Sequence, residues 1–444
     1  MNRDNIDFKD GKVSVLFRKM LIPTLLGALS ICAVTAIDGI FIGHGVGADG
    51  IAAVNIVVPI YQIMAGFGLM VGVGCSVATS IHMSQNNIKV ARLNVTQAIL
   101  IASLIVAIFA LAVILFPNTT GKLLGASSTL LPQVSDYLVW IMPSFVFQMW
   151  SMIGLFTIRI DGSPKYAMWC NIIPATLNAI LDWVFIFPLN MGVKGAAIAT
   201  GISIIFGGIM ALYYLLFRYK TIGITKLKWS VTCLKLSLRN FSYHCKIGSS
   251  TLLGEMTLAV LIYVGNIIFM HYLGDDGVGA FGIACYYMPF FFMIGNAIAQ
   301  SAQPIISFNY GIEDWKKIRE TRTLLLKYCI VSGVLVSTLF IFFPKELVVL
   351  FVDAHSKAGE IAIEGFPILA SGILFFILNV AIIGYYQSIE LIKRATLYVL
   401  LRGFIILIPC FILLPMFLGS IGMWIAMPVA EFFTLIIIGA TLRR

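Results

Sequence analysis

Four carboxylates lie inside long apolar runs of this 444-residue chain: Asp38, Asp182, Glu255 and Glu431. An ionised side chain in such a run is costly, so each of the four is a candidate functional residue. A buried carboxylate without a basic partner takes up a proton, shares a proton with a second carboxylate, or binds a cation. The chemistry that these residue types indicate is therefore ion or proton exchange.

The first candidate site combines Asp38 with Asn178, Asp182 and Thr200. Counting about 1.5 Å per helical residue places Asp38 and Asp182 in the outer part of a membrane, with Thr200 at a similar depth. Asn178 precedes Asp182 by four residues, so both lie on one helix face. No Lys or Arg lies at that depth in this half of the chain. We expect a coupling-ion site for H⁺ or Na⁺; the alternative is a structural hydrogen bond between the two aspartates.

The second candidate site contains Glu255, Arg402 and Glu431, all near mid-depth. Arg402 can neutralise one of the two carboxylates. The other then stays available for a cationic substrate or a second proton. The alternative is a purely structural Arg–Glu pair that fixes helix packing.

The composition indicates that membrane helices carry these side chains. The chain is 60% hydrophobic and only 11% charged, whereas a soluble domain has about 25% charged residues. Apolar runs of about 20 residues can cross the hydrocarbon, and a backbone in lipid must satisfy its own hydrogen bonds as a helix. We therefore predict an all-α integral membrane protein with twelve transmembrane helices, at residues 18–43, 50–82, 92–116, 131–158, 165–187, 194–217, 244–271, 277–308, 322–343, 361–387, 394–416 and 420–441.

The basic residues predict the orientation of these helices. With the N-terminus in the cytoplasm, 26 of the 30 Lys and Arg residues lie in inward segments, and four lie in outward loops: Lys122, Lys194, Lys345 and Lys357. Basic residues favour the cytoplasmic side. We expect a multi-pass protein of the bacterial inner (plasma) membrane, with both termini cytoplasmic and no cleavable signal peptide. The net charge of +10 then reflects topology beside anionic lipid and indicates no nucleic-acid partner.

The chain repeats itself at an offset of about 227 residues. We expect a six-helix lobe at 1–217, a cytoplasmic linker at 218–243 and a second six-helix lobe at 244–444. An even number of spans gives the two bundles the same topology, so they form a parallel repeat related by an axis along the membrane normal. A cleft between such lobes suits alternating access. The matching pairs are Gly50 and Gly277, Gly68 and Gly295, Lys89 and Lys316, Arg92 and Arg319, Pro117 and Pro344, Gly192 and Gly419, and Gly195 and Gly422.

Five segments, in this order and topology, resemble the multidrug and toxic compound extrusion (MATE) family over nearly the whole chain. They are Asp38–Gly43, Arg159–Pro164, Asn178–Asp182, Gly192–Ala197 and Gln303–Gly311. The chain looks most similar to the bacterial MepA-type and DinF-type branch. The resemblance implies cation-coupled export of amphipathic, often cationic drugs.

The resemblance also implies roles for individual residues. Members of the family use positions matching Asp38, Asn178, Asp182 and Thr200 for the coupling ion. Several branches use an acidic residue in the seventh helix, which favours Glu255. The sequence departs from other branches because no Asp or Glu lies between Glu364 and Glu390, and because Asn86-Asn87 stand where a glycine is common.

The sequence supports alternative functions less well. A flippase for a lipid-linked saccharide or another polyprenyl-linked substrate would need several deep Lys or Arg side chains, and Arg402 alone is deep. The sequence has neither a catalytic motif for a membrane enzyme nor a polar stripe for a channel. We expect no enzyme activity, no cofactor besides the coupling ion, and no metal besides Na⁺ at the first site. The expected partners are amphipathic small molecules and membrane lipid, and the expected state is a monomer.

Two smaller expectations concern packing and solvation. The glycine-rich run Gly66–Gly74 predicts close helix packing through Gly68 and Gly72. Asp161 and Glu390 lie in inward turns near basic residues, so we expect both to be solvated.

Overall fold

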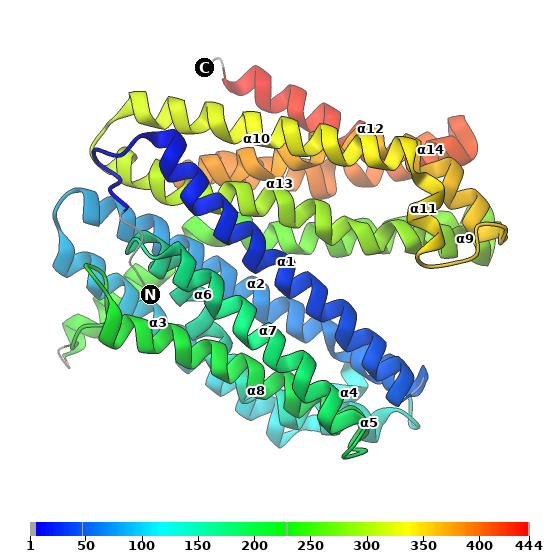
Figure 1. Cartoon of the computed structure of the whole chain (residues 1–444), viewed down its shortest axis with the longest axis horizontal. Coiled ribbons are helices and arrows are strands. Elements are labelled where there is room, and N and C mark those ends of the chain that lie inside the picture. Colours follow the sequence, from blue (N-terminus) through cyan, green and yellow to red (C-terminus); the bar gives the residue numbers. More distant parts are fainter. Residues whose placement is uncertain (1–5, 47, 228–229, 443–444) are drawn as a thin grey trace. The chain divides into compact units, whose positions relative to one another are not determined.

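The structure, a computed structural model, describes residues 6–46, 48–227 and 230–442, and every regular element among them is a helix (Figure 1). Ten of these helical segments are long and apolar enough to cross a membrane, and the bent pair α5 and α6 makes an eleventh crossing. The segment Ile392–Thr441 has 50 residues and breaks at Gly419. Since one crossing needs about 20 residues, this segment holds two spans, and the predicted all-α fold with twelve transmembrane helices is confirmed.

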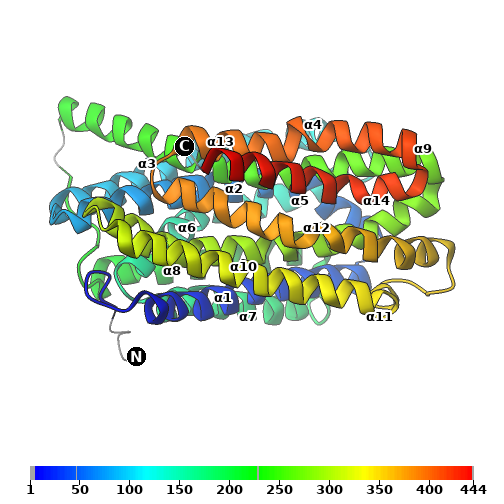
Figure 2. The ribbon, with the colours of Figure 1, turned by 90° about the horizontal axis from the view of Figure 1, so that it is seen from above.

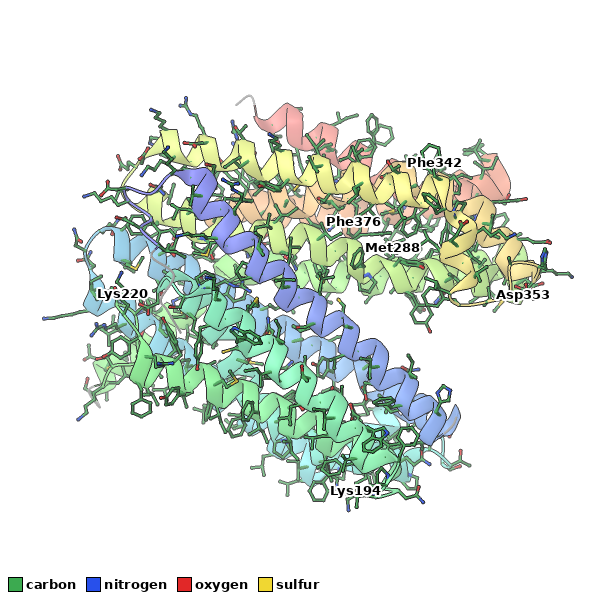
Figure 3. All side chains as sticks on the ribbon, viewed as in Figure 1. Lys194, Lys220, Met288, Phe342, Asp353 and Phe376 are labelled. Carbon is green, nitrogen blue, oxygen red and sulfur yellow. The ribbon has the colours of Figure 1, made fainter. Side chains whose placement is uncertain are left out.

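The chain divides into two compact units, and each is described by itself. The first unit runs to Gly248 and includes Ser307–Asp314. Figure 3 places Lys194 and Lys220 at opposite ends of this unit. Its elements are α1 (Val13–Gly45), α2 (Ala48–Ser84), α3 (Ile88–Leu115), α4 (Pro117–Leu123), α5 (Leu131–Ile141), α6 (Ser144–Ile160), α7 (Pro164–Ile186), α8 (Gly192–Tyr213), the π-helix η1 (Tyr214–Arg218) and the start of α9 (Val231–Gly311).

The second unit holds Ser249–Ile306 and the residues from Trp315 onward. It therefore contains most of α9, which is one continuous run except for a break at Gly274. In Figure 2 the long helices α10, α12 and α14 run side by side. The remaining elements are α10 (Trp315–Phe342), α11 (Pro344–Val349), α12 (Lys357–Ser388), α13 (Ile392–Leu400), the π-helix η2 (Leu401–Ile405) and α14 (Leu407–Leu442).

The internal repeat extends to backbone conformation. Asn86 and Glu313 are 227 residues apart and both adopt left-handed φ angles, 60° and 59°. Gly192 and Gly419, at the same offset, both have φ 58°. Asparagine tolerates this region better than most side chains do, so Asn86 can occupy this position without a glycine.

Glycines allow close packing in the first unit, as the sequence predicts. A Cβ atom added at Gly68 would lie 3.0 Å from the Cε atom of Met149, and one at Gly72 would lie 2.9 Å from the ring of Phe156. Both neighbours belong to α6, so the glycine face of α2 packs directly against that helix. The small-residue interpretation of this run is confirmed.

The fourth span, expected at 131–158, is bent in the structure. It consists of α5 and α6, which meet at Pro143 and bend by 52°. A proline inside a helix removes one backbone hydrogen bond and clashes with the preceding turn. The bend is therefore the direct result of this proline.

The seventh span begins earlier than expected. Helix α9 starts at Val231 rather than near residue 244, and the side chain of Ser230 caps it by accepting a hydrogen bond from the Cys233 backbone N–H at 3.1 Å. The residues that follow are charged and polar enough to look like a connection. Their buried positions nevertheless recur with helical spacing.

Asp161 is buried, so the expectation of a solvated side chain is wrong. Its carboxylate accepts hydrogen bonds from the backbone N–H groups of Lys220, Thr221 and Ile222 at 2.6–2.7 Å and from the Tyr214 hydroxyl at 2.8 Å. These donors come from a segment about 60 residues further along the chain. Nearby basic residues suggested solvation, but backbone amides satisfy this carboxylate.

We expect Asp161→Asn to lower the thermal unfolding midpoint of the protein in detergent. The amide can replace only one acceptor oxygen, so buried N–H or O–H donors lose their partner, at a cost of about 1–3 kcal/mol each. Asp10→Asn is the matched control because Asp10 is exposed. Equal midpoints for both variants would show that the segment after η1 does not depend on this carboxylate.

Candidate functional site

The first predicted site is assembled by α1, α7 and α8 of the first unit. Helix α1 packs along α7, which also packs against α8. A Cβ atom at Gly27 would lie 3.0 Å from the Asn171 side-chain amide, so this glycine lets α1 approach α7 closely. The close approach brings the polar residues of both helices within reach of one another.

Asp38 and Asp182 lie together, as the sequence predicts. Their carboxyl groups are close enough to interact directly. Asp182 is fully buried, and neither of its oxygens nor Oδ1 of Asp38 has a conventional hydrogen-bond donor in the described part of the chain. Two carboxylates at this separation cannot both stay ionised without a proton or a cation between them. They titrate as a pair rather than as two independent groups.

Asn178 and Thr200 extend the acidic pair with neutral oxygens. The Asn178 side-chain amide donates to Oγ1 of Thr200 at 3.4 Å, which joins α7 to α8 one helical turn from Asp182. The four predicted coupling residues therefore lie in one region of the first unit. Carboxylate, amide and hydroxyl oxygens are ligands that hard cations prefer.

Two tyrosines adjoin this cluster, and sequence reasoning did not assign them to it. Tyr137 on α5 interacts with Thr200 and lies within electrostatic reach of both aspartates. Tyr61 on α2 lies within reach of Asp38. A depth count could have found Tyr137, because it lies six residues into α5, whereas Thr200 lies eight residues into α8.

In the second unit Arg402 pairs with Glu431. Arg402 Nη2 lies 2.7 Å from Glu431 Oε1, and both side chains are about 2% exposed. Asn379 donates to Oε2 of the same glutamate at 2.7 Å. The guanidinium lies over the ring of Phe376, 4.2 Å from its centre, and Figure 3 places Phe376 within the second unit. This geometry satisfies both charges and matches the structural alternative for this pair.

Glu255 on α9 is the carboxylate that Arg402 does not neutralise. It makes no hydrogen bond or ion pair with any described residue, and it is partly exposed. The structure therefore identifies Glu431 as the glutamate that pairs with Arg402. Glu431 is compensated, and Glu255 is free to meet a cation or a proton.

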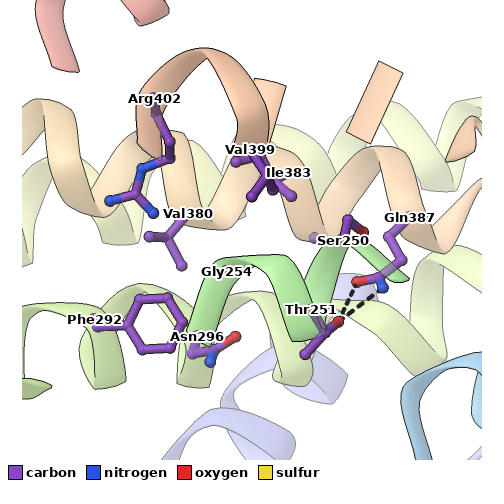
Figure 4. Close-up of a pocket in the computed structure, with 11 residues that line it drawn as sticks. Ser250, Thr251, Gly254, Phe292, Asn296, Val380, Ile383, Gln387, Val399 and Arg402 are labelled. Atoms are coloured by element: carbon purple, nitrogen blue, oxygen red, sulfur yellow. Dashed lines mark hydrogen bonds between the residues drawn. The ribbon is translucent and has the colours of Figure 1, made fainter. Parts of the chain in front are cut away.

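A small cavity with both polar and apolar walls lies beside this region of the second unit (Figure 4). Its volume is about 30 Å³, and Thr251 and Gln387 on its wall are joined by hydrogen bonds of 2.8 and 3.2 Å. Arg402 points toward it from η2, and Asn296 from α9. About 10–15 Å³ holds one water molecule, so the cavity suits a few waters and excludes a drug-sized molecule.

A duplicated bundle of membrane helices is an architecture that many membrane transporters share. The MatE family model matches the chain twice, over residues 23–184 and 252–413. The matches cover well over half of the chain, and one falls in each copy of the repeat. The chain therefore belongs to the MatE family of membrane transporters.

Individual relatives resemble the chain over most of its length. It is 23% identical over 421 residues to the multidrug export protein MepA of Staphylococcus aureus, which covers 94% of this chain and 91% of MepA. It is 22% identical over 337 residues to a protein of Shewanella oneidensis named FAD transporter, covering 75% of this chain and 73% of that one. The solved structure of the MATE multidrug transporter DinF-BH matches with a TM-score of 0.86 at 27% identity, covering 100% of this chain and 98% of that one.

We expect Glu431→Gln to destabilise the protein strongly, because it leaves Arg402 as a buried charge without a counter-ion, at a cost of about 3–5 kcal/mol. Glu255→Gln is the matched control and should leave the thermal unfolding midpoint nearly unchanged. The double variant Arg402→Met/Glu431→Leu should recover much of the loss, since it removes both charges together. A double variant no more stable than Glu431→Gln would argue against the ion pair as the cause.

Proposed function

We propose that this protein is a cation-coupled antiporter that exports amphipathic, often cationic, small molecules by alternating access. The coupling ion is H⁺ or Na⁺. The observation that carries the proposal is the Asp38–Asp182 pair, buried in the first unit without a basic partner among the described residues. The relative named multidrug export protein supports the class of substrate.

The proposed coupling mechanism follows from the charge on the aspartate pair. A proton shared between Asp38 and Asp182, or a sodium ion bound there with oxygens of Asn178 and Thr200, removes their mutual repulsion. Loss of the ion restores the repulsion between α1 and α7. An ion drives a conformational change only if it binds the two states with different affinity. A site formed by several helices has such a difference if those helices move apart during the cycle.

No observation in the described residues favours the alternative flippase. A polyprenyl-linked saccharide carries phosphates and would need unpaired deep cations. Arg402 is the deep cation that the sequence offers, and it is already paired with Glu431 and packed over the Phe376 ring. Because one relative is named FAD transporter, we propose to include anionic compounds among the substrates assayed.

The proposed setting is a bacterial inner membrane, with both termini and the connection after η1 on the cytoplasmic side. The support is the excess of Lys and Arg on that side. We propose a monomer whose partners are small-molecule substrates and membrane lipid.

A cysteine placed at exposed Lys220 should react with a membrane-impermeant reagent only after the cytoplasmic side is opened.

We expect Asp38→Asn to abolish gradient-driven export while the protein still inserts and folds. Asparagine keeps the size of the side chain but cannot ionise, so the pair loses the charge change that couples the ion to the conformation. Efflux from proteoliposomes under an imposed proton gradient, and separately under a sodium gradient, measures this. The gradient that drives the wild type identifies the ion.

Asp136→Asn is the matched control for this variant, since Asp136 is an exposed carboxylate on α5 of the same unit. It should export at the wild-type rate. If Asp38→Asn also exported at that rate, the coupling site proposed for the first unit would be wrong, and Glu255 would become the leading candidate.

We expect Glu255→Gln to reduce export of cationic substrates by about tenfold more than export of neutral ones. Loss of one unit of favourable charge interaction at an effective dielectric constant near 20 is worth on the order of 1.4 kcal/mol or more. Transport of a cationic and a neutral dye of similar size, compared in the same vesicles, gives the ratio. An equal loss for both dyes would show that Glu255 does not select charge.

A further inference from the structure

The first turns of α9 form a surface helix with a single narrow buried stripe. Ser237, Phe241 and His244 are buried, and they recur at the spacing of four and three residues that one face of a helix requires. Most other positions from Val231 to Tyr243 are exposed or half-buried. This stretch therefore rests on the first unit along one line and presents the rest of its surface outward.

Contacts with α2 and α3 fix the depth of this stretch. The Asn240 side-chain amide donates to Oε1 of Gln97 at 2.9 Å, and the Phe241 ring lies 6.4 Å from that of Phe67. Gln97 lies nine residues beyond the start of α3, about 14 Å along the helix axis. Asn240 is therefore at the depth of membrane lipid. Val231 lies nine residues earlier, about 14 Å back along α9, so the stretch runs from the level of the start of α3 into the lipid and its exposed residues face the membrane interface.

The exposed face is both apolar and basic. Val231, Leu234 and Leu238 are 72%, 60% and 52% exposed. Lys235 and Arg239 are also exposed, and they follow Leu234 and Leu238 directly in the sequence. We call these five residues the linker face. Its spacing of three, four, seven and eight residues from Val231 puts them on one side of the helix.

No negative charge balances the linker face within its own stretch of sequence. Residues 183–254 contain no Asp or Glu, so the local charge is entirely basic. The preceding segment adds exposed Lys220 and Lys226. Asp161 holds the backbone of Lys220 in place, and the Thr225 N–H donates to Oγ1 of Thr96 on α3 at 3.0 Å. This segment too is therefore fixed against the first unit.

We propose that the linker face is a docking surface for anionic phospholipid, with acyl chains along Val231, Leu234 and Leu238 and headgroup phosphates at Lys235 and Arg239. Long basic side chains lay their stems along apolar surface and extend their charges to the headgroups. Apolar and basic residues combined on one helix face are typical of a helix that lies at a membrane interface. The depth and the unbroken positive charge favour lipid over a protein partner. The proposal does not depend on the coupling site.

The test compares binding of phosphatidylglycerol and phosphatidylcholine to the purified full chain in mixed micelles, followed by the shift of the thermal unfolding midpoint. Lys235→Gln/Arg239→Gln should bind phosphatidylglycerol roughly 30-fold more weakly than wild type, since each basic residue near an anionic surface contributes about 1 kcal/mol. Its response to phosphatidylcholine should not change. Lys316→Gln/Lys393→Gln removes two exposed cations outside the linker face and should bind as wild type does.

Equal weakening in both double variants would overturn the proposal, because the effect would then be one of net charge. So would wild-type binding by Lys235→Gln/Arg239→Gln. A photo-crosslinking residue placed at Leu238 in cells shows whether lipid, a second copy of the chain or another protein contacts the linker face. A band at twice the monomer mass would mean a second copy, and any other protein adduct would mean a protein partner; either overturns the lipid assignment. Adducts with phospholipid alone support it.

Discussion

The cost of a charge inside apolar helices is the constraint on which the rest of the structure depends. The carboxylates inside the chain avoid this cost in different ways. Asp161 is surrounded by backbone N–H groups, and Glu431 is paired with Arg402. Asp38 and Asp182 have chiefly one another. Asp161 and Glu431 are satisfied by groups of the protein itself, whereas the aspartate pair needs a proton or cation from outside. Under the proposed coupling, this difference separates structural from functional charge.

The two halves share their helix scaffold but differ in the charged residues inside it. Turns and glycines recur at the offset of 227, down to the left-handed backbone at Asn86 and Glu313. The basic pairs Lys89–Lys316 and Arg92–Arg319 recur, whereas the charged residues inside the spans do not. The position equivalent to Asp38 is Gly265, and that of Asp182 is Pro409; those of Arg402 and Glu431 are Ala175 and Ile204. Similar helix packing therefore holds two carboxylates, Asp38 and Asp182, in one half and a neutralised ion pair, Arg402 and Glu431, in the other.

The sequence predicted what depends on periodicity and depth. Runs of apolar residues gave the twelve spans, and a count of helical rise placed Asp38, Asn178, Asp182 and Thr200 at one level, where the structure places them together. It could not choose between Glu255 and Glu431 as the partner of Arg402, because that choice depends on the rotation of each helix about its own axis. The burial of Asp161 was missed for a related reason: its donors are backbone groups far along the chain, which have no side-chain signature.

The Arg402–Glu431 and Asp38–Asp182 clusters differ in how easily they could change during a transport cycle. Opening the Arg402–Glu431 pair would expose two charges at once in an apolar interior, a cost of several kcal/mol per ion. Asn379 and Phe376 add contacts to this pair, so the cluster joins helices α12, α14 and η2. The Asp38–Asp182 pair has the opposite property, because a single proton decides whether its two carboxylates attract or repel. The helices that bear or touch it are α1, α2, α5, α7 and α8. Under the proposed coupling the ion acts on the packing of these helices, while the second unit keeps its shape and offers Glu255 as a fixed charge.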